Sequence, residues 1–452
     1  MKTSRYNFLF KFEGKNILFN SKTTALAMLS DDEYDKLAPF VEKESISIDA
    51  DILEPDLVKN LSYGGFFIDD SFDEIKSLRF DMFKARFNSS SLSLTIAPTL
   101  ACNFNCPYCY ERTSSRNLTI TDDVKQGLYE FVKSYIGRIN NLSITWYGGE
   151  PLLCLKDIEE MTSHFKEICK DKVFYSAGMT TNGYLLDKET LLKLKDLSVS
   201  NIQITFDGFK EKHDKTRCLS DGSGSFDKII ANLVSFKSLY DDKNNKLPSI
   251  SLRLNTTREN HKDMIKLINY LKEKDLLDYT SPYLAKIDDP LDKVYKHCLT
   301  YEEFALLEKE FNADYASLTG KKTSRNSYPE KISAVCGCDS LNSYVIDPQG
   351  YLYKCWEEIG KREFAIGNLK DGVDYKTIDR AYDYMLYDPS EDVKCANCKI
   401  LPLCMGGVCP YRRINNVLPS CDNKMKTIKN NILSFLNTRE IKEAVLNESF
   451  AN

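Results

Sequence analysis

Apolar runs and amphipathic stretches alternate over the central part of the chain. Six short apolar runs are typical of strands, and the segments between them repeat apolar residues every three to four positions, as helices do. We predict strands at 92–96, 143–147, 174–180, 201–206, 250–255 and 281–287, and helices at 121–137, 156–169, 187–197, 227–240 and 262–273. Strands that alternate with helices favour right-handed parallel βαβ units, so the pattern predicts an open, partial α/β barrel of six units. In parallel barrels the functional residues collect at the carboxyl ends of the strands.

The first 85 residues have a different pattern. Aromatic side chains alternate with other residues at Tyr6, Phe8, Phe10 and Phe12, and Gly14 indicates a turn before a second apolar run. This predicts a β-hairpin with one aromatic face. A helix over 30–42, a third strand at 64–68 and a charged helix over 73–85 complete a candidate first module, residues 1–85.

Chemically distinctive residues follow the predicted barrel strands. After the first strand come three cysteines at C-x3-C-x2-C spacing, Cys102, Cys106 and Cys109, with the aromatic Tyr108 just before the last. Paired glycines, which let a ligand approach the backbone closely, begin the run Gly148-Gly149-Glu150-Pro151 after the second strand. Later strand ends carry hydroxyl, amide and charged side chains: Thr181, Asn182, Thr205, Asp207, Arg253 and Asn255.

The cysteine triplet suits an iron–sulfur cluster better than zinc. Three thiolates cannot complete a tetrahedral zinc site, whereas a 4Fe-4S cluster on three cysteines keeps one iron for an outside ligand. A partial zinc knuckle or three buried thiols is the alternative.

Composition limits the remaining classes of function. The net charge is −5, so nothing suggests a nucleic-acid footprint or a polybasic membrane anchor. The first residues lack the apolar core of a secretory signal, and no apolar run approaches membrane-spanning length. We therefore predict a soluble, cytoplasmic protein whose fifteen cysteines stay reduced and can serve as ligands. Four scattered cysteines are expected to be small core residues: Cys154, Cys169, Cys218 and Cys298.

Taken together, the run APTLACNFNCPYCYE and the downstream GGEP resemble the radical S-adenosylmethionine (SAM) family. The resemblance implies that Cys102, Cys106 and Cys109 hold a 4Fe-4S cluster, whose free iron is chelated by SAM. It also implies that Tyr108 packs beside the adenine, that the GGEP segment holds the SAM amino group, and that the later strand ends contact the ribose and carboxylate. One electron from the cluster would then break SAM and form a 5′-deoxyadenosyl radical. The run DGFKEKHDKTR resembles that of peptide-modifying members, and we expect His213, Asp214 and Arg217 to organise this loop near the substrate.

A second cysteine array lies near the carboxyl terminus and resembles the seven-cysteine SPASM domain. The resemblance implies two auxiliary 4Fe-4S clusters, one on Cys338, Cys355 and Cys409 with Cys336 as the candidate fourth ligand. The other would use a set of four cysteines: Cys395, Cys398, Cys404 and Cys421. Four residues separate Cys404 from Cys409 where the family has three, which weakens the Cys409 assignment. Two all-thiolate zinc sites are the alternative.

The expected architecture is therefore α/β: a winged-helix-like module at 1–85, a partial (β/α)6 radical SAM barrel at 92–300, a SPASM domain at 331–425 and a helical tail at 426–452. By resemblance, the expected function is modification of a ribosomally made precursor peptide, with a cysteine thioether crosslink as the leading reaction. The first module would bind the leader of that peptide, and an external donor of the flavodoxin or ferredoxin type would supply electrons.

Two alternatives stay open. A formylglycine-generating sulfatase-maturing enzyme would carry an acidic base directly after the equivalent of Cys355, where this chain has Trp356 and only then Glu357. A non-catalytic iron–sulfur electron carrier is the alternative from another class, and the intact GGEP and strand-end residues count against it.

Overall fold

The computed structural model describes residues 1–41, 53–111, 117–242, 244–287, 298–320, 328–407 and 409–415, together with 421, 428, 431–433 and 435. At its centre is a ten-stranded sheet in the order β11-β10-β9-β8-β7-β6-β12-β13-β14-β15. The six barrel strands are β6 (Ser91–Ile96), β7 (Asn141–Trp146), β8 (Phe174–Thr181), β9 (Val199–Phe206), β10 (Ser249–Thr256) and β11 (Thr280–Lys286). Neighbours among these six pair in parallel, which confirms the predicted open α/β barrel.

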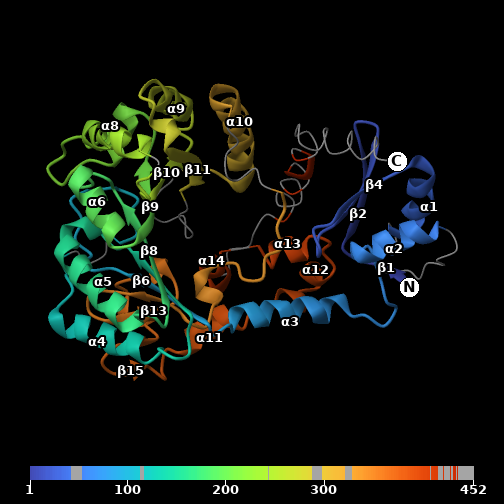
Figure 1. The fold of residues 1–452 in the computed structure, drawn as a ribbon, viewed down its shortest axis with the longest axis horizontal. Coiled ribbons are helices and arrows are strands. Elements are labelled where there is room, and N and C mark those ends of the chain that lie inside the picture. The colour runs from blue at the N-terminus through green and yellow to red at the C-terminus, as the bar shows by residue number, and fades with distance from the viewer. Residues whose placement is uncertain are drawn as a thin grey trace.

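Helices follow each strand of the barrel and cover its outer side (Figure 1). They are α4 (Asp122–Lys133), α5 (Leu155–Cys169), α6 (Lys188–Asp196), α7 (Lys210–Thr216), α8 (Phe226–Asp241) and α9 (Asp263–Glu273). Along α5, Ile158, Met161 and Phe165 recur on one face and are fully buried in the main core. The barrel strands alternate between an apolar face that joins the main core and a more polar face. On β7, Leu142, Ile144 and Trp146 share one face and are fully buried, whereas Ser143 between them is exposed.

The amino-terminal module contains the predicted hairpin and two strands that the sequence did not reveal, β1 (Lys2–Thr3) and β4 (Leu26–Leu29). β2 (Asn7–Phe12), β3 (Lys15–Asn20) and β4 (Leu26–Leu29) form an antiparallel sheet in that order. Three helices accompany it: α1 (Asp31–Val41), α2 (Pro55–Tyr63) and α3 (Glu74–Arg86). The strand predicted at 64–68 shortens to β5 (Phe67–Ile68) and pairs with β1 (Lys2–Thr3), apart from the hairpin. The first residues of the predicted strand instead terminate α2, where Gly64 is the C-cap and Gly65 has φ +74°.

The aromatic face of the hairpin is an internal interface. Leu9 and Leu18 point to the side of α1, where Leu18 packs with Leu37 in one small core. Phe8 and Phe19, which are paired across the ladder, lie on the opposite face in a second cluster. That cluster contains residues from far along the chain: Tyr328, Leu403, Ile428 and Ile432. The predicted aromatic face is therefore present, and the chain itself covers much of it.

The carboxy-terminal region continues the barrel sheet. β12 (Ser343–Ile346) pairs in parallel with β6, and β13 (Tyr351–Tyr353), β14 (Gly367–Asn368) and β15 (Gly372–Val373) extend the sheet antiparallel. The sheet strands of this region are followed by four short helices: α11 (Asp379–Met385), α12 (Val393–Ala396), α13 (Leu401–Cys404) and α14 (Pro410–Ile414). The long α10 (Tyr301–Thr319) packs against α9.

Most of the helical tail predicted at 426–452 lies outside the described residues. Within the described part of the chain, no helix is long and apolar enough to cross a membrane.

Candidate active site

A cavity of about 370 Å³ opens at the carboxyl ends of the parallel strands. Most of the residues predicted from the sequence line it: Cys102, Cys106, Tyr108, Cys109, Gly148, Gly149, Thr181, Asn182, Thr205, Arg253 and Asn255. The carboxy-terminal region contributes Trp356 and Glu357. The cavity is thus formed by segments more than 250 residues apart in the chain.

The cysteine loop after β6 is anchored on both sides. The Phe104 N–H donates a hydrogen bond to the Cys102 sulfur, with 3.4 Å between nitrogen and sulfur. The Asn105 N–H donates to the Cys218 carbonyl oxygen at 2.9 Å. Burial raises the pKa of the Cys102 thiol to about 12, and it also raises the pKa of Cys106. Without a metal these thiols are protonated at neutral pH, so binding a metal there releases protons.

The glycine pair after β7 has no room for side chains. Gly148 has φ +105°, and a Cβ there would lie 2.4 Å from the Thr99 carbonyl oxygen. A Cβ on Gly149 would lie 2.2 Å from the Ala101 carbonyl oxygen. Both glycines are therefore required by close approach to the cysteine loop, and they offer main-chain groups to the cavity.

Glu150 faces away from the cavity. Its carboxylate is fully buried and accepts hydrogen bonds from Thr181 Oγ1 at 2.7 Å, the Asn182 N–H at 2.8 Å and the Leu152 N–H at 3.1 Å. Burial raises the pKa of Glu150, and these three hydrogen bonds oppose the shift. Neither Glu150 nor Pro151 lines the cavity. Glu150 therefore joins the loop after β7 to the end of β8 and positions the glycine pair.

Asp207, at the end of β9, accepts hydrogen bonds from three sides. Tyr108 donates to its two carboxylate oxygens at 2.9 and 2.7 Å, Thr216 donates at 2.7 Å, and Asn255 donates at 3.2 Å. Arg217 in turn donates to the Tyr108 hydroxyl at 3.0 Å. Burial raises the pKa of Tyr108 well above its ordinary value, so the phenol stays a neutral donor. This network fixes Tyr108, which lies between the cysteines in the sequence.

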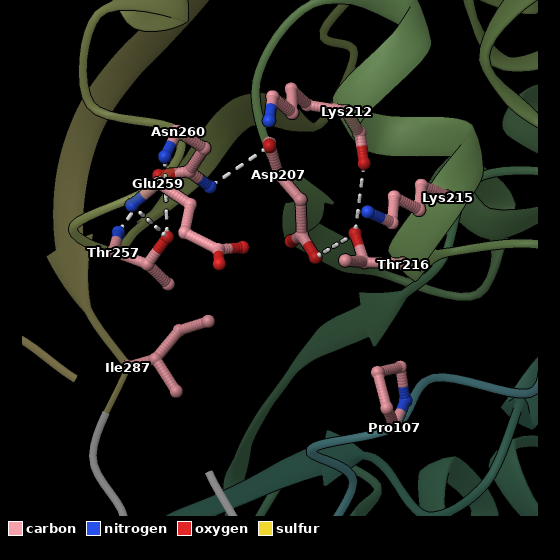
Figure 2. A pocket seen from close by; sticks show the side chains of 9 residues that line it. All are labelled: Pro107, Asp207, Lys212, Lys215, Thr216, Thr257, Glu259, Asn260 and Ile287. Atoms are coloured by element: carbon pink, nitrogen blue, oxygen red, sulfur yellow. Dashed lines mark hydrogen bonds between the residues drawn. The ribbon is translucent and has the colours of Figure 1, made fainter. Parts of the chain in front are cut away.

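A second cavity of about 250 Å³ adjoins the first at Ile287 (Figure 2). Figure 2 shows Asp207 at its centre, with Thr216 bound to the carboxylate and Asn260 donating to the main-chain oxygen at 2.9 Å. Lys212 and Lys215 of α7 lie on one side and Glu259 on the other. Asp207 therefore borders the second cavity, while its hydrogen-bond partners Tyr108 and Asn255 line the first.

The run from His213 to Arg217 organises the loop after β9. His213 is fully buried with Nε2 3.0 Å from Ser225 Oγ, and burial holds its pKa well below the ordinary range. Asp214 accepts from the main-chain N–H groups of Ser225 and Phe226 at 2.8 Å each, at the start of α8. Of this run only Arg217 lines the first cavity.

Sequence reasoning missed several residues of the first cavity, notably Tyr110, Glu111, Tyr147 and Gln203. A positional signal was available for three of them, since Tyr110 and Glu111 follow Cys109 and Tyr147 precedes Gly148. Gln203 carries no such signal. It faces the cavity from within β9 and accepts a hydrogen bond from Tyr283 at 2.7 Å.

The carboxy-terminal cysteines fall into two groups. Cys336 and Cys338 are hydrogen-bonded through sulfur. The pKa of Cys355 is raised by burial first, and then by Glu358, Cys409 and Cys336. Burial and Asp392 raise the pKa of Cys395 to about 11, with smaller contributions from three other thiols: Cys404, Cys421 and Cys398. These two groups have the same membership as the two predicted auxiliary clusters.

The surroundings of the first group suit an anionic cluster. Lys354 is buried and donates to the Ser343 and Ser340 carbonyls, at 2.9 and 2.5 Å. Burial lowers its pKa to about 8, and the neighbouring Cys338 opposes that shift. Arg86 is fully buried nearby, 4.0 Å from Asp339. Two buried cations beside thiols would offset the negative charge of thiolate ligands.

Among the described residues, no set of three or more His, Cys, Asp or Glu side chains converges closely enough to hold one metal ion.

Comparison with known proteins agrees with the geometry. The family model described as the radical SAM superfamily matches residues 96–281. The chain is 27% identical over 340 residues to a cysteine-type anaerobic sulfatase-maturating enzyme of Clostridium novyi, covering 70% of this chain and 87% of that one. It is 25% identical over 373 residues to the radical SAM cyclopropyl synthase TigE of Paramaledivibacter caminithermalis, covering 78% and 75%.

Two solved structures share the fold. A tagged anSMEcpe with bound AdoMet superposes with a TM-score of 0.58 at 20% identity, covering 79% of this chain and 99% of that one. Streptococcus suis SuiB bound to precursor peptide SuiA gives a TM-score of 0.53 at 16% identity, covering 92% and 97%. The match to the radical SAM superfamily spans the cysteine loop, the glycine pair and the strand ends that line the first cavity, so residues 96–281 are similar to a radical SAM domain.

Proposed function

We propose that this protein is a radical SAM enzyme that modifies a ribosomally made peptide whose reactive residue enters the 370 Å³ cavity. The observation that carries the proposal is the composition of that cavity. Barrel residues suited to SAM line most of it, and Trp356 and Glu357 of the carboxy-terminal region complete it. A cavity shared between the SAM site and a second region can receive a substrate from that side.

Each part of the barrel wall has a role in this proposal. Cys102, Cys106 and Cys109 would hold the 4Fe-4S cluster, and the main chain of the glycine pair would receive the SAM amino group. Arg253 suits the SAM carboxylate because a guanidinium–carboxylate pair is charge-assisted. Its Nε donates to Asn255 Oδ1 at 3.0 Å, which orients it in the cavity. When bound, the cluster and SAM supply a 5′-deoxyadenosyl radical, and the protein's task is to orient the substrate and exclude water.

We assign the carboxy-terminal cysteines to two auxiliary 4Fe-4S clusters. The two thiol groups and the buried cations beside the first group support this assignment. Bound there, an auxiliary cluster would supply an acceptor for the electron that the substrate must lose.

The leading reaction is formation of a cysteine thioether. The substrate forms one C–S bond and loses two hydrogens: one leaves as a hydrogen atom to the 5′-deoxyadenosyl radical, and the other leaves as a proton and an electron. The proton goes to a base or to water and the electron to an auxiliary cluster. The likeness to SuiB, which was solved with a precursor peptide, and to the cyclopropyl synthase TigE supports a peptide substrate.

A second candidate is oxidation of a peptidyl cysteine to formylglycine. The similarity to a cysteine-type sulfatase-maturating enzyme favours it. The structure also weakens the sequence argument against it. Although Trp356 occupies the position directly after Cys355, the carboxylate-bearing Glu357 lines the cavity and could act as the base.

The amino-terminal module is the proposed site for the leader of the precursor peptide. Because the chain covers much of the aromatic face, the leader would bind to an edge of the three-stranded sheet. β4 is one such edge, and Met28 within it is 41% exposed. Adding a strand to an edge gains main-chain hydrogen bonds, and side-chain pockets then provide specificity.

The test uses short cysteine-containing peptides encoded beside the gene. Each is incubated with anaerobically reconstituted enzyme, SAM and dithionite, and the product is analysed by mass spectrometry. A thioether product has lost two hydrogens, retains sulfur and no longer reacts with a thiol alkylating agent. A formylglycine product has lost sulfur and reacts with a hydrazine.

The control is the variant in which Cys102, Cys106 and Cys109 are all alanine, which must leave every peptide unchanged. If the wild-type enzyme cleaves SAM and yet modifies none of these peptides, the peptide assignment is wrong.

A further inference from the structure

The lining of the first cavity differs in charge between the segments that supply it. The barrel supplies the cations Arg217 and Arg253. Where Trp356 of the carboxy-terminal region contacts Tyr147 of the loop after β7, the lining is aromatic and acidic, with Tyr147, Trp356 and Glu357. We refer to these three residues as the aromatic–acidic wall.

The wall is a fixed platform with an accessible ring. The rings of Tyr147 and Trp356 lie 4.5 Å apart between centroids, at 41° to one another. The Tyr147 hydroxyl is hydrogen-bonded to that of Tyr110, which holds Tyr147 in place. Trp356 is 41% exposed, whereas the chain's other tryptophan, Trp146, is fully buried. Trp356 is thus available to a molecule that enters the cavity.

Negative potential accompanies this platform. The acidic side chains Glu111 and Glu357 line the same cavity as Tyr110 and Tyr147. The face of an indole ring attracts cations, and a nearby carboxylate adds to that attraction.

We propose that the aromatic–acidic wall is a subsite for the substrate and that it selects a peptide residue with a cationic side chain, lysine or arginine. This inference rests on the proposed function, in which a peptide enters the cavity. The aliphatic part of such a side chain would lie against Trp356 and Tyr147, with its charged end near Glu357. A glutamate or aspartate in the same place would be repelled.

The first test measures peptide binding directly. Full-length, anaerobically reconstituted enzyme saturated with SAM is titrated by calorimetry with capped pentapeptides of sequence Gly-Gly-X-Gly-Gly, where X is lysine, arginine, norleucine or glutamate. Norleucine keeps most of the apolar stem of lysine without the charge. Cation–π attraction predicts that the lysine and arginine peptides bind about tenfold more tightly than the norleucine peptide. Equal binding of lysine and norleucine peptides, or binding by none of them, would overturn the proposal.

Single-residue variants then test which side chains cause the preference for the lysine peptide. Trp356→Ala is expected to abolish the lysine preference, Trp356→Phe to retain part of it, and Glu357→Gln to weaken it and reduce its salt dependence. Tyr375→Ala is the matched control, because Tyr375 is an 88% exposed aromatic residue of the same region that does not line the cavity. A lysine preference that survives in Trp356→Ala and Glu357→Gln would place the cation site elsewhere and contradict the proposal.

The SAM readout separates this inference from the proposed function. The affinity for SAM is measured by the same calorimetry in Trp356→Ala and Glu357→Gln, and the proposal requires that both variants retain it. If either variant loses SAM affinity, the wall binds the SAM ammonium and the subsite assignment is wrong, although the enzyme would still be a peptide modifier. If a cysteine peptide is modified by wild-type enzyme but the pentapeptides show no discrimination, only the present inference fails.

Discussion

The cysteine loop of the barrel and the carboxy-terminal cysteine array hold similar thiols on different supports. The loop lies at the ends of six paired strands, and buried hydrogen bonds such as that from Thr181 to Glu150 connect one strand end to the next. In the second thiol group of the array, Cys395 lies on α12 and Cys404 on α13, and these helices have four residues each. A site on an extended sheet is preformed, whereas a site on short elements depends more on its metal. We therefore expect that a metal bound at the carboxy-terminal array would contribute more to folding than one bound at the barrel loop.

Charge compensation also differs between the two regions. The barrel loop has Arg217 and the polar strand ends, all of which line an open cavity. The carboxy-terminal array has Lys354 and Arg86, both buried and away from that cavity. The barrel cations can therefore meet a ligand that enters the cavity, whereas the buried cations would stabilise an anionic cluster bound at the carboxy-terminal thiols.

The largest effect is expected from removing the barrel cysteines. Replacing Cys102, Cys106 and Cys109 with alanine should abolish formation of 5′-deoxyadenosine under dithionite, because in the family's pattern this triplet leaves one iron of its cluster free for SAM. Iron content should fall from about twelve to about eight per chain. Cys395→Ala is the matched variant from the other array, and it should retain uncoupled SAM cleavage. Undiminished cleavage by the triple variant would reverse the assigned roles of the two arrays.

A smaller but still large effect is expected at Gly148. Gly148→Ala would place a Cβ 2.4 Å from the Thr99 oxygen, and it should cost about 3 kcal/mol of unfolding free energy and lower SAM affinity. Gly137→Ala is a control for backbone strain, since Gly137 also has positive φ, at +88°, but has nothing within 4 Å of the added carbon. We expect it to cost about 1 kcal/mol with SAM affinity retained. The measurements are chemical denaturation and SAM calorimetry, and equal losses in both variants would mean that the close approach at Gly148 is unimportant.

The smallest effect is expected at Cys336. Its thiol is hydrogen-bonded to Cys338, and chiefly for that reason its pKa falls to about 6, so it is ready to serve as a ligand. In Cys336→Ser the three remaining cysteines should retain the first auxiliary cluster, with a loss of about one iron or none. The change should instead be visible in the electron paramagnetic resonance spectrum of the reduced protein. The variant is best made in the triple-alanine background, where only auxiliary clusters contribute. An unchanged spectrum would show that Cys336 is not a ligand.

Much of the barrel could be read from the sequence because its strands are short apolar runs between amphipathic helices. The six strands and five helices appear at nearly the predicted bounds. The amino-terminal module was harder. β4 has only four residues and no clear alternation, and the apparent strand at 64–68 is mostly the end of α2. For both β4 and the segment 64–68, the local sequence did not favour one conformation clearly, and pairing with other parts of the protein decided which residues form a strand.

The candidate site also combines features that the sequence predicted with features that only the structure revealed. Cysteine spacing and the glycine pair identified the chemistry, because those residue types have few other uses at that spacing. The sequence did not reveal that Glu150 turns away from the cavity or that Tyr147 faces Trp356. The first depends on hydrogen bonds to the end of β8, and the second brings together residues more than 200 positions apart.

What the sequence by itself determined is the order of strands and helices, and that the cysteine loop and the glycine pair belong to one candidate site. These are encoded by local periodicity and by spacing, which do not require knowledge of distant contacts. Only the tertiary structure decided which face of the hairpin is covered, which residues of the GGEP motif face the cavity, and that Trp356 and Glu357 complete its wall. Those outcomes depend on packing between distant segments, whose geometry is set when β12 joins β6 and brings the carboxy-terminal region against the barrel.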